Sequence, residues 1–232
     1  ARVNFKDIFN YSDESFERTA NIENGTLINL YDFGNQNVNG DSVAGILHSI
    51  VSAGHEHDGE VPTDLELARI VAELAKYSSG ELDATDVVCD PAAGSGNLIS
   101  AAIPTYNLVP TQIVVNDVNS KLLELLSLRI GLNYASTISL RNSPAIYNRN
   151  IADVDPVFFN DVKVVVMNPP FSAGINCVAR KQPLYRSIRR LTGNEAKTNI
   201  GQMPLEAVFL ELLIELVQPG TTISCVFPKT HL

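Results

Sequence analysis

The 232-residue sequence contains no tryptophan, two methionines and three cysteines. An odd number of cysteines gives no complete disulfide framework, and Cys89 and Cys225 lie in apolar runs where a thiol behaves as a small hydrophobic side chain. No run of about 18 apolar residues is present, and the first residues lack the apolar stretch of a signal peptide. These absences predict a soluble intracellular protein without disulfides.

Positive charge is also scarce, because 17 Lys and Arg stand against 26 Asp and Glu, for a net charge of -9. General affinity for nucleic-acid phosphates requires clustered Lys and Arg, so any contact with nucleic acid has to be local. Hydrophobic residues make up 45% of the chain and charged residues 19%. This composition predicts a folded domain with a buried core.

Apolar runs typical of strands alternate with amphipathic stretches typical of helices. A helix is expected to begin at Thr63 or Asp64, because Thr63 and Glu66 have capping-box spacing before a helical stripe of Leu67, Ile70, Val71 and Leu74. Strands are expected at 87–89, 113–115, weakly at 137–140, at 163–167 and at 222–228, with a long helix at 205–217. The alternation predicts an α/β fold with a mostly parallel sheet and helices on both faces.

The first 60 residues are acidic and are expected to form a separate, partly helical segment before a domain at 61–232. Within it, residues 41–52 have the pattern of an amphipathic helix. His55 and His57 alternate as two metal ligands could, but the flanking glycines favour a solvated turn. No metal site is therefore predicted.

The stretch Asp90-Pro91-Ala92-Ala93-Gly94-Ser95-Gly96-Asn97 reads as the end of a buried strand, a glycine turn and a helix start. Glycines in such a turn let the backbone approach a nucleotide-like ligand closely. A second apolar strand ends at Asn116-Asp117, 21 positions beyond Gly96. An acid about 20 residues past the glycines binds the ribose hydroxyls in nucleotide-binding α/β units; the alternative is that Asp117 only caps the helix that follows it.

The nucleotide is not expected to be NAD. A dinucleotide turn requires a third glycine where this chain has Ile99, and the Asp90 charge would oppose a pyrophosphate. A nucleoside without phosphates and with a cationic centre suits the same acids better, which points to S-adenosylmethionine.

A further strand runs into Asn168-Pro169-Pro170-Phe171. Two prolines fix the backbone and cannot donate hydrogen bonds, so the tetrapeptide forms a rigid platform at the sheet edge. The plainer alternative is a strand-ending turn with a buried phenylalanine.

With these motifs in this order, the chain resembles the S-adenosylmethionine-dependent adenine-N6 DNA methyltransferases of restriction-modification and related defence systems. The resemblance covers residues 61–232 and implies a Rossmann-like methyltransferase fold, with the gamma order of motifs, in a cytoplasmic protein of a bacterium or archaeon. The cofactor-binding residues it implies are Thr63, Asp90, Ala92, Gly94, Gly96, Asn97, Asp117 and Asp153. The catalytic residues it implies are Asn168, Pro169, Pro170 and Phe171.

Two features depart from the family. The chain has Thr63-Asp64 where the family commonly has Thr-Pro, and it ends at Leu232, where the family's sheet continues with two more strands and usually a target-recognition region. We therefore expect the chain to be part of a larger protein or a subunit that depends on another domain or subunit to recognise its DNA sequence.

The resemblance implies that Asn168 and the Pro169 carbonyl accept hydrogens from the adenine amino group, and that Phe171 stacks on an adenine flipped out of the duplex. Positive charge gathers directly after this tetrapeptide, which suggests contacts with the DNA backbone; a solvated helix face is the alternative. The residues proposed for these contacts are Arg180, Lys181, Arg186, Arg189 and Arg190. Methylation of an RNA base or a protein glutamine, or a catalytically silent cofactor-binding subunit, are the alternative functions.

Overall fold

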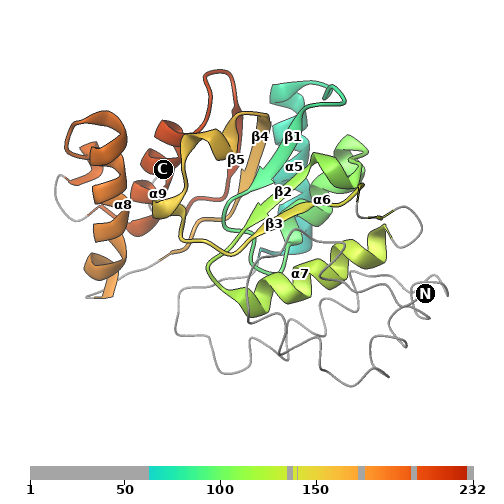
Figure 1. Ribbon diagram of the computed structural model, residues 1–232, viewed down its shortest axis with the longest axis horizontal. Coiled ribbons are helices and arrows are strands. Elements are labelled where there is room, and N and C mark those ends of the chain that lie inside the picture. The colour runs from blue at the N-terminus through green and yellow to red at the C-terminus, as the bar shows by residue number, and fades with distance from the viewer. Residues whose placement is uncertain (1–62, 135–137, 140, 172–175, 200–202, 229–232) are drawn as a thin grey trace.

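The computed structural model describes residues 63–134, 138–139, 141–171, 176–199 and 203–228. Five parallel strands form one sheet in the order β3-β2-β1-β4-β5 (Figure 1). Their bounds are β1 Val87–Asp90, β2 Ile113–Asn116, β3 Ala145–Tyr147, β4 Val162–Met167 and β5 Thr222–Cys225. The α/β fold with a parallel sheet is thereby confirmed.

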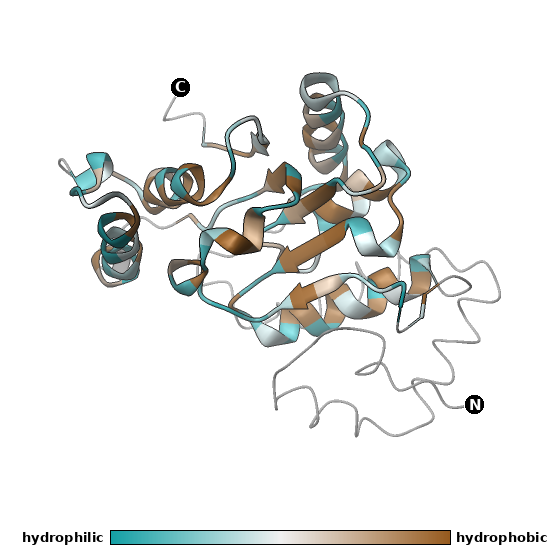
Figure 2. Ribbon diagram, turned by 45° about the horizontal axis from the view of Figure 1, so that its top comes forward, coloured by the Kyte–Doolittle hydropathy of each residue, from teal (hydrophilic) through white to brown (hydrophobic). Residues whose placement is uncertain are grey.

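Side-chain alternation along the strands divides the core into two layers. Val88 and Val164 point into a cluster on one face of the sheet, whereas their neighbours Cys89 and Val165 point into a cluster on the other. Because both faces are buried, the central strands read as continuous apolar runs, which appear as brown ribbons in Figure 2.

Helices cover both faces of the sheet, as the sequence predicts. The first face is covered by α5 (Leu65–Ser79), α6 (Asn97–Tyr106) and α7 (Ser120–Asn133), and the second by α8 (Asn176–Thr192) and α9 (Leu205–Leu216). Four short 3-10 helices connect these elements: η1 Pro110–Gln112, η2 Ile151–Asp153, η3 Pro156–Phe159 and η4 Lys197–Asn199. The predicted helix at 205–217 is confirmed, with Val217 as its C-cap.

The start of α5 differs from the capping box expected between Thr63 and Glu66. Asp64 is the N-cap, and its Oδ1 accepts hydrogen bonds from the backbone N–H groups of Glu66 and Leu67 at 2.8 and 3.3 Å. A carboxylate is a strong cap because it also interacts with the positive end of the helix dipole.

The buried face of α5 also differs from the predicted stripe. Its buried residues are mainly small ones, namely Ala68, Val71, Ala72 and Ala75, so the helix lies close to the sheet. Leu67, Ile70 and Leu74 instead lie on an exposed face, at 39, 50 and 59% exposure. The prediction that the large side chains of this helix form its buried face is thus wrong for Leu67, Ile70 and Leu74.

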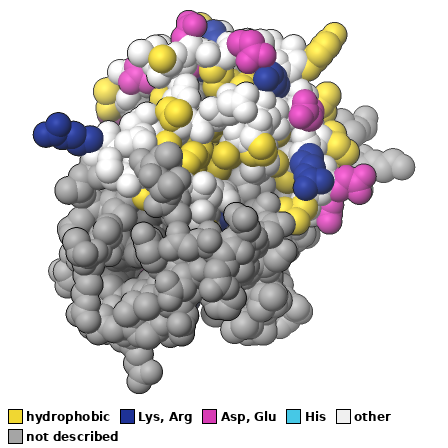
Figure 3. All heavy atoms as spheres, turned by 90° about the vertical axis from the view of Figure 1, so that its right-hand side faces the viewer, with side chains coloured by type: hydrophobic (Ala, Val, Ile, Leu, Met, Phe, Trp, Pro, Cys, Tyr) yellow, Lys and Arg dark blue, Asp and Glu magenta, His cyan; other side chains and the backbone are white. Residues whose placement is uncertain are grey.

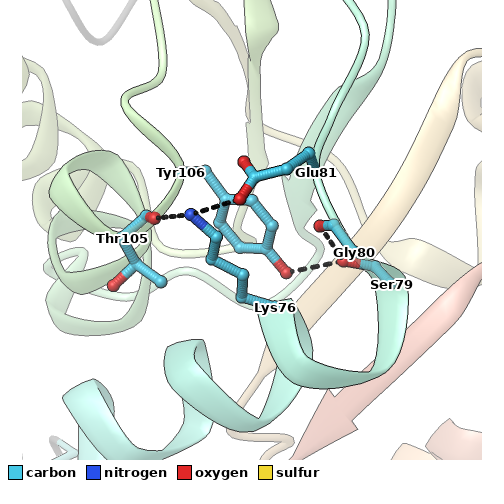
Figure 4. Close-up of polar contacts among 6 residues, drawn as sticks. All are labelled: Lys76, Ser79, Gly80, Glu81, Thr105 and Tyr106. Carbon is cyan, nitrogen blue, oxygen red and sulfur yellow. Dashed lines mark hydrogen bonds and ion pairs between the residues drawn. The ribbon is translucent and has the colours of Figure 1, made fainter.

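The carboxyl ends of α5 and α6 are joined by polar contacts (Figure 4). The Lys76 ammonium donates to the Thr105 carbonyl at 2.9 Å and forms an ion pair with Glu81 at 3.1 Å. The Ser79 and Tyr106 hydroxyls lie 3.0 Å apart. These contacts hold the carboxyl ends of the two helices together.

One strand was predicted in the wrong place. The weak strand expected at 137–140 is not a strand at residues 138 and 139, where Ser139 makes an isolated antiparallel bridge with Asn142. The third strand is β3, which pairs with β2 through Ile146 and Val115. The run Ala145-Ile146-Tyr147 is too short for its alternation to stand out.

The expected acidic segment at 1–60, its amphipathic stretch at 41–52 and the His55–His57 turn lie outside the described residues. Among the described helices, none combines the length and the apolar character that crossing a membrane requires.

The glycine at the start of α6 generates a stability prediction. Gly96 has a φ of 87°, and a Cβ there would lie 2.1 Å from Leu126 Cδ1 in α7, whereas Gly220, with a φ of 94°, has nothing within 4 Å. Gly96→Ala should cost about 2 to 5 kcal/mol, from left-handed backbone strain plus overpacking.

Gly220→Ala is the matched control, and it should cost about 1 to 2 kcal/mol because it has the strain alone. Urea unfolding of both variants measures the difference. Equal losses of stability would show that the contact between Gly96 and α7 does not constrain the loop.

Candidate functional site

The described residues place the ends of three neighbouring strands, β2, β1 and β4, at one edge of the sheet. β1 pairs with β2 on one side and with β4 on the other, so the strand order reverses at β1 and β4. Loops that leave the carboxyl ends of strands at such a reversal diverge to opposite faces and leave a crevice for ligands. Both predicted motifs leave the sheet there, Asp90–Asn97 after β1 and Asn168–Phe171 after β4.

Asp90 ends β1 in a nearly water-free position, with 1% of its surface exposed. Burial raises the pKa of Asp90 well above its usual value; the hydrogen bond from the Ala92 N–H (3.2 Å) acts against this rise, and the nearby Asp117 carboxylate adds to it. Burial without a cation nearby disfavours the charged form of this carboxyl. A ligand with a positive charge would reverse that preference.

Asp117 holds the glycine turn from the neighbouring strand. Its Oδ2 accepts the Gly94 N–H at 2.7 Å, and its Oδ1 accepts the Asn119 N–H at 2.8 Å. The alternative that Asp117 only caps the following helix is wrong, because the N-cap of α7 is Asn119, which accepts from the Lys121 and Leu122 N–H groups. Asp117 is half-exposed at the sheet edge, where a hydroxyl could reach it.

Asn116, which sequence reasoning missed, connects the loops at this edge. Its side chain is 1% exposed and donates to the carbonyls of Pro91 (3.1 Å) and Arg149 (3.0 Å), while its Oδ1 accepts the Arg149 N–H. Its own carbonyl accepts the Ala93 N–H at 3.0 Å. The available signal was an amide that ends an otherwise apolar strand, where a buried polar group must find partners.

Thr63 and Asn97, two of the predicted cofactor-binding residues, are joined by a hydrogen bond. The Asn97 side chain, at the first position of α6, donates to the Thr63 carbonyl at 2.5 Å, and it accepts from Arg129 of α7 at 2.5 Å. Thr63, just before α5, is therefore fixed to the end of the glycine turn although 34 residues separate the two in sequence.

The tetrapeptide after β4 lies partly open at the same edge. Pro169 is buried, whereas Asn168, Pro170 and Phe171 are half-buried. The last residue of β4 is held in the sheet by the Val226 N–H, which donates to the Met167 carbonyl at 3.0 Å. An amide oxygen, a carbonyl and an aromatic ring can thus be presented from a backbone that two prolines make rigid.

Asp153, at the end of η2, is exposed and lies on the α8 side of this edge. Together with Arg186 and Arg190 of α8 it lines a cavity of about 180 Å³. Its neighbour Ala152 belongs to the same apolar cluster that Ala92 of the glycine turn packs against. The structure thus places Asp153 beside the arginines of α8.

The five basic residues proposed for DNA contacts have different environments on α8. Lys181 is 8% exposed and donates to the Met203 carbonyl at 2.7 Å, so its charge is directed into the protein. Arg189 pairs with Glu195 at 2.9 Å, and Arg190 donates to Ser187 Oγ at 3.1 Å and weakly to the Val154 carbonyl at 3.5 Å. Arg180 and Arg186 are exposed.

Basic side chains are sparse on the face of the molecule that Figure 3 shows. On the face drawn in Figure 3, the Lys and Arg side chains of the described residues lie singly, most of them beside Asp or Glu. This face carries no continuous basic patch among the residues drawn in colour, which leaves α8 as the stronger basic feature.

The residues at the crevice fit a nucleoside with a cationic group. A buried carboxyl at Asp90 suits a positive charge, and the half-exposed Asp117 suits ribose hydroxyls. The space that a side chain at Gly96 would take is filled by Leu126 of α7, so this glycine is required for packing. A pyrophosphate would meet two acids there. No group of three or more His, Cys, Asp or Glu that could hold a metal ion occurs within the described ranges.

Solved structures that resemble the chain include three restriction-modification proteins. The type IIG restriction endonuclease BpuSI is 42% identical, with a TM-score of 0.77, over 83% of this chain and 22% of that protein. A type I restriction-modification methyltransferase subunit from Streptococcus thermophilus is 19% identical (TM-score 0.57, 82% of this chain and 39% of that one). The ATP-dependent type ISP restriction-modification enzyme LlaBIII, bound to DNA, is 12% identical (TM-score 0.51, 77% and 16%). No family model and no curated protein matches the chain.

These likenesses define the class: the chain has the Rossmann-like α/β fold of the methyltransferases. Within that class, the resemblance to the adenine-N6 DNA methyltransferase family of restriction-modification systems, which the motifs indicated, is confirmed. The chain spans less than two fifths of the length of the first two structures described above.

The buried carboxyl of Asp90 generates a prediction for the ligand-free protein. An acid whose pKa is raised by folding stabilises the folded state at low pH, and this contribution is lost as the pH rises from the unfolded value through the folded one. Asp90→Asn removes the cost of ionisation, so it should raise the melting temperature near neutral pH, by about 2 to 4 °C for each kcal/mol gained.

Asp161→Asn, at an exposed position before β4, is the control and should change the melting temperature little. Melting curves from about pH 4 to pH 8 measure both variants. A ligand-free Asp90→Asn protein that melts below the wild type at neutral pH would contradict the assignment of Asp90 as a destabilising buried acid.

Proposed function

We propose that this chain transfers a methyl group from S-adenosylmethionine to the N6 amino group of adenine in DNA, as part of a restriction-modification or related defence system. The observation that carries the proposal is the placement of two motifs at one sheet edge, the glycine turn after β1 and the Asn-Pro-Pro-Phe platform after β4. The 42% identity to a type IIG restriction endonuclease supports it.

The cofactor would be held by the residues that close the crevice on the β1 side. Asp90 would face the positive charge of the methionyl part, Asp117 would accept the ribose hydroxyls, and the Gly94–Gly96 turn would lie against the nucleoside. Thr63, Ala92, Asn97 and Asp153 complete the proposed cofactor residues. When bound, S-adenosylmethionine supplies an electrophilic methyl group.

The residues after β4 would prepare the adenine amino group to react. Its nitrogen is a poor nucleophile because its lone pair is delocalised into the ring. Two fixed acceptors, the Asn168 side-chain oxygen and the Pro169 carbonyl, would take its hydrogens in hydrogen bonds and leave the lone pair directed at the methyl group. The sulfur–methyl bond of the donor would break as the nitrogen–methyl bond forms, which would leave a neutral thioether. The amino group would then lose one proton to water, so that the methylated product is neutral.

Phe171 would hold the base in this position. The amino group of adenine is paired inside a duplex, so the base has to be flipped out, and an aromatic ring that stacks on it offsets part of the lost stacking. Phe171 is half-buried, which leaves part of its ring available. Pro170 keeps the ring fixed relative to Asn168.

Contacts with the DNA backbone would come from the basic face of α8. Arg180, Arg186, Arg189 and Arg190 are all exposed. Arg189 also pairs with Glu195, and Arg190 donates to the Val154 and Ser187 oxygens. Lys181 is not expected to contact the DNA backbone, because its ammonium donates a hydrogen bond to the Met203 carbonyl.

Asn168→Ala is the test of the chemistry. It should lower methyl transfer to DNA by about 100-fold or more, the usual loss for a fixed group that acts in the transition state. Binding of the cofactor, measured by calorimetry, should change less than about twofold, because the amide acts on the base. Transfer of labelled methyl groups is measured with DNA, RNA and protein offered in parallel.

Asn160→Ala is the matched control, because this amide precedes β4 and its side-chain oxygen accepts a hydrogen bond from Gln218 at 3.3 Å; it should keep full transfer. Label that appears on RNA or on a protein amide, but not on DNA adenine, would overturn the substrate assignment. Binding without transfer to any acceptor would favour a catalytically silent subunit.

Arg186→Gln tests the DNA-facing role of α8. Removal of one phosphate contact should weaken DNA binding for all sequences alike and reduce the slope of log K against log salt by about 1. Lys163→Gln removes an equally exposed cation at the other end of β4 and should leave the slope unchanged. An unaltered slope in Arg186→Gln would exclude this face of the helix from the interface.

A further inference from the structure

Arg129 is a charged side chain in an almost fully buried position. It lies in the third turn of α7, 2% of its surface is exposed, and it belongs to the largest fully buried side chains of the described residues. Its neighbours Leu126 and Ile130 are part of the apolar core. A guanidinium removed from water in this way has to be used by specific hydrogen bonds.

Those hydrogen bonds go to the glycine turn. One terminal nitrogen of Arg129 donates to Asn97 Oδ1 at 2.5 Å and, more weakly, to the Ser95 carbonyl at 3.4 Å. The guanidinium therefore contacts residues on either side of Gly96.

Two further contacts hold the glycine turn. Asp117, just before α7, accepts the Gly94 N–H at 2.7 Å, and Leu126 fills the space beside Gly96. Leu126 and Arg129 are three residues apart and share one face of the helix. The turn is thus held at Gly94 by the residue that follows β2, and at Gly96 and Asn97 by residues of α7.

The orientation of the Asn97 amide depends on this arginine. Because a guanidinium can only donate, it selects the amide oxygen of Asn97 and leaves the NH₂ group for the Thr63 carbonyl at 2.5 Å. The reversed amide would place donor against donor and carbonyl against carbonyl. Arg129 consequently determines how Thr63, at the start of α5, is joined to the turn.

We infer that Arg129 is a positioning residue for the cofactor: it acts through Asn97 to set the glycine turn and Thr63 in the geometry that binds S-adenosylmethionine. This inference rests on the proposed function. Its loss should affect the binding of the cofactor and leave the platform after β4 unchanged. The expected signature is a selective loss of cofactor affinity.

The test compares Arg129→Lys, Arg129→Ala and the wild type in the complete chain. The dissociation constant for S-adenosylmethionine should rise about tenfold or more in Arg129→Ala and less in Arg129→Lys, which keeps a donor. The KM for DNA and the kcat at saturating cofactor should stay within about twofold of the wild type. Ser127→Ala is the control, because the buried Ser127 hydroxyl donates to the Leu123 carbonyl within the same helix. This variant should leave cofactor affinity unchanged.

Chemical rescue separates positioning from general damage. Asn97 and Arg129 line a cavity of about 300 Å³ between α5 and α6, so a guanidinium ion can reach the space that Arg129→Ala leaves. Low concentrations of guanidinium should restore cofactor affinity in Arg129→Ala, whereas sodium at equal ionic strength should not. A structural defect alone would become worse in guanidinium.

Asn97→Asp gives a second route if Arg129→Ala fails to fold. A carboxylate keeps the bond to Arg129 but has no NH₂ group for the Thr63 carbonyl, so cofactor affinity should fall. Circular dichroism and the melting temperature, measured alongside, show whether the variant is folded. Folded Arg129 and Asn97→Asp variants that bind S-adenosylmethionine as tightly as the wild type would overturn the inference. A wild-type chain that does not bind S-adenosylmethionine at all would instead overturn the proposed function.

Discussion

Parallel pairing of β1 with both β2 and β4 is the constraint on which the site depends. Parallel strands all end at the same edge, so residues that are distant in sequence meet there without any long loop. Asp90 and Asn168 come together because Cys89 pairs with Val165, and Asp117 reaches Gly94 because β2 adjoins β1 on the other side. The pairing in turn depends on the burial of both sheet faces under separate helical layers.

Much of this arrangement could be predicted from the sequence, because it is encoded in local patterns. Central strands buried on both faces are continuous Val and Ile runs, and the glycines, prolines and acids that follow them have strong backbone preferences. The short β3 strand was placed a few residues too early, since three residues cannot express a period. The packing face of α5 was misjudged because small alanines, and not the large residues beside them, let the helix approach the sheet.

The contacts that could not be predicted are those between side chains from different elements. Asn116 and Arg129 each occupy a position where a pattern of apolar residues predicts an apolar side chain, and their partners lie 25 to 34 residues away in sequence. A polar residue in an apolar pattern signals that a partner exists, but identification of that partner requires the fold. The distribution of charge on α8 is a similar case, because the same helix contains an inward Lys181 and an outward Arg186.

The exposed stripe of α5 has a consequence for the behaviour of the chain in solution. Leu67, Ile70, Leu74 and Tyr77 follow each other at spacings of three and four residues, which is the spacing of a coiled-coil seam. On the adjoining flank of the helix, Val71 accepts a hydrogen bond from Ser224 of the half-exposed edge strand β5. Burial of apolar surface does not require one particular partner. A second copy of the chain can therefore cover this stripe, as another part of the same chain can. The exposed stripe of α5 is therefore an apolar surface through which the chain can associate in solution.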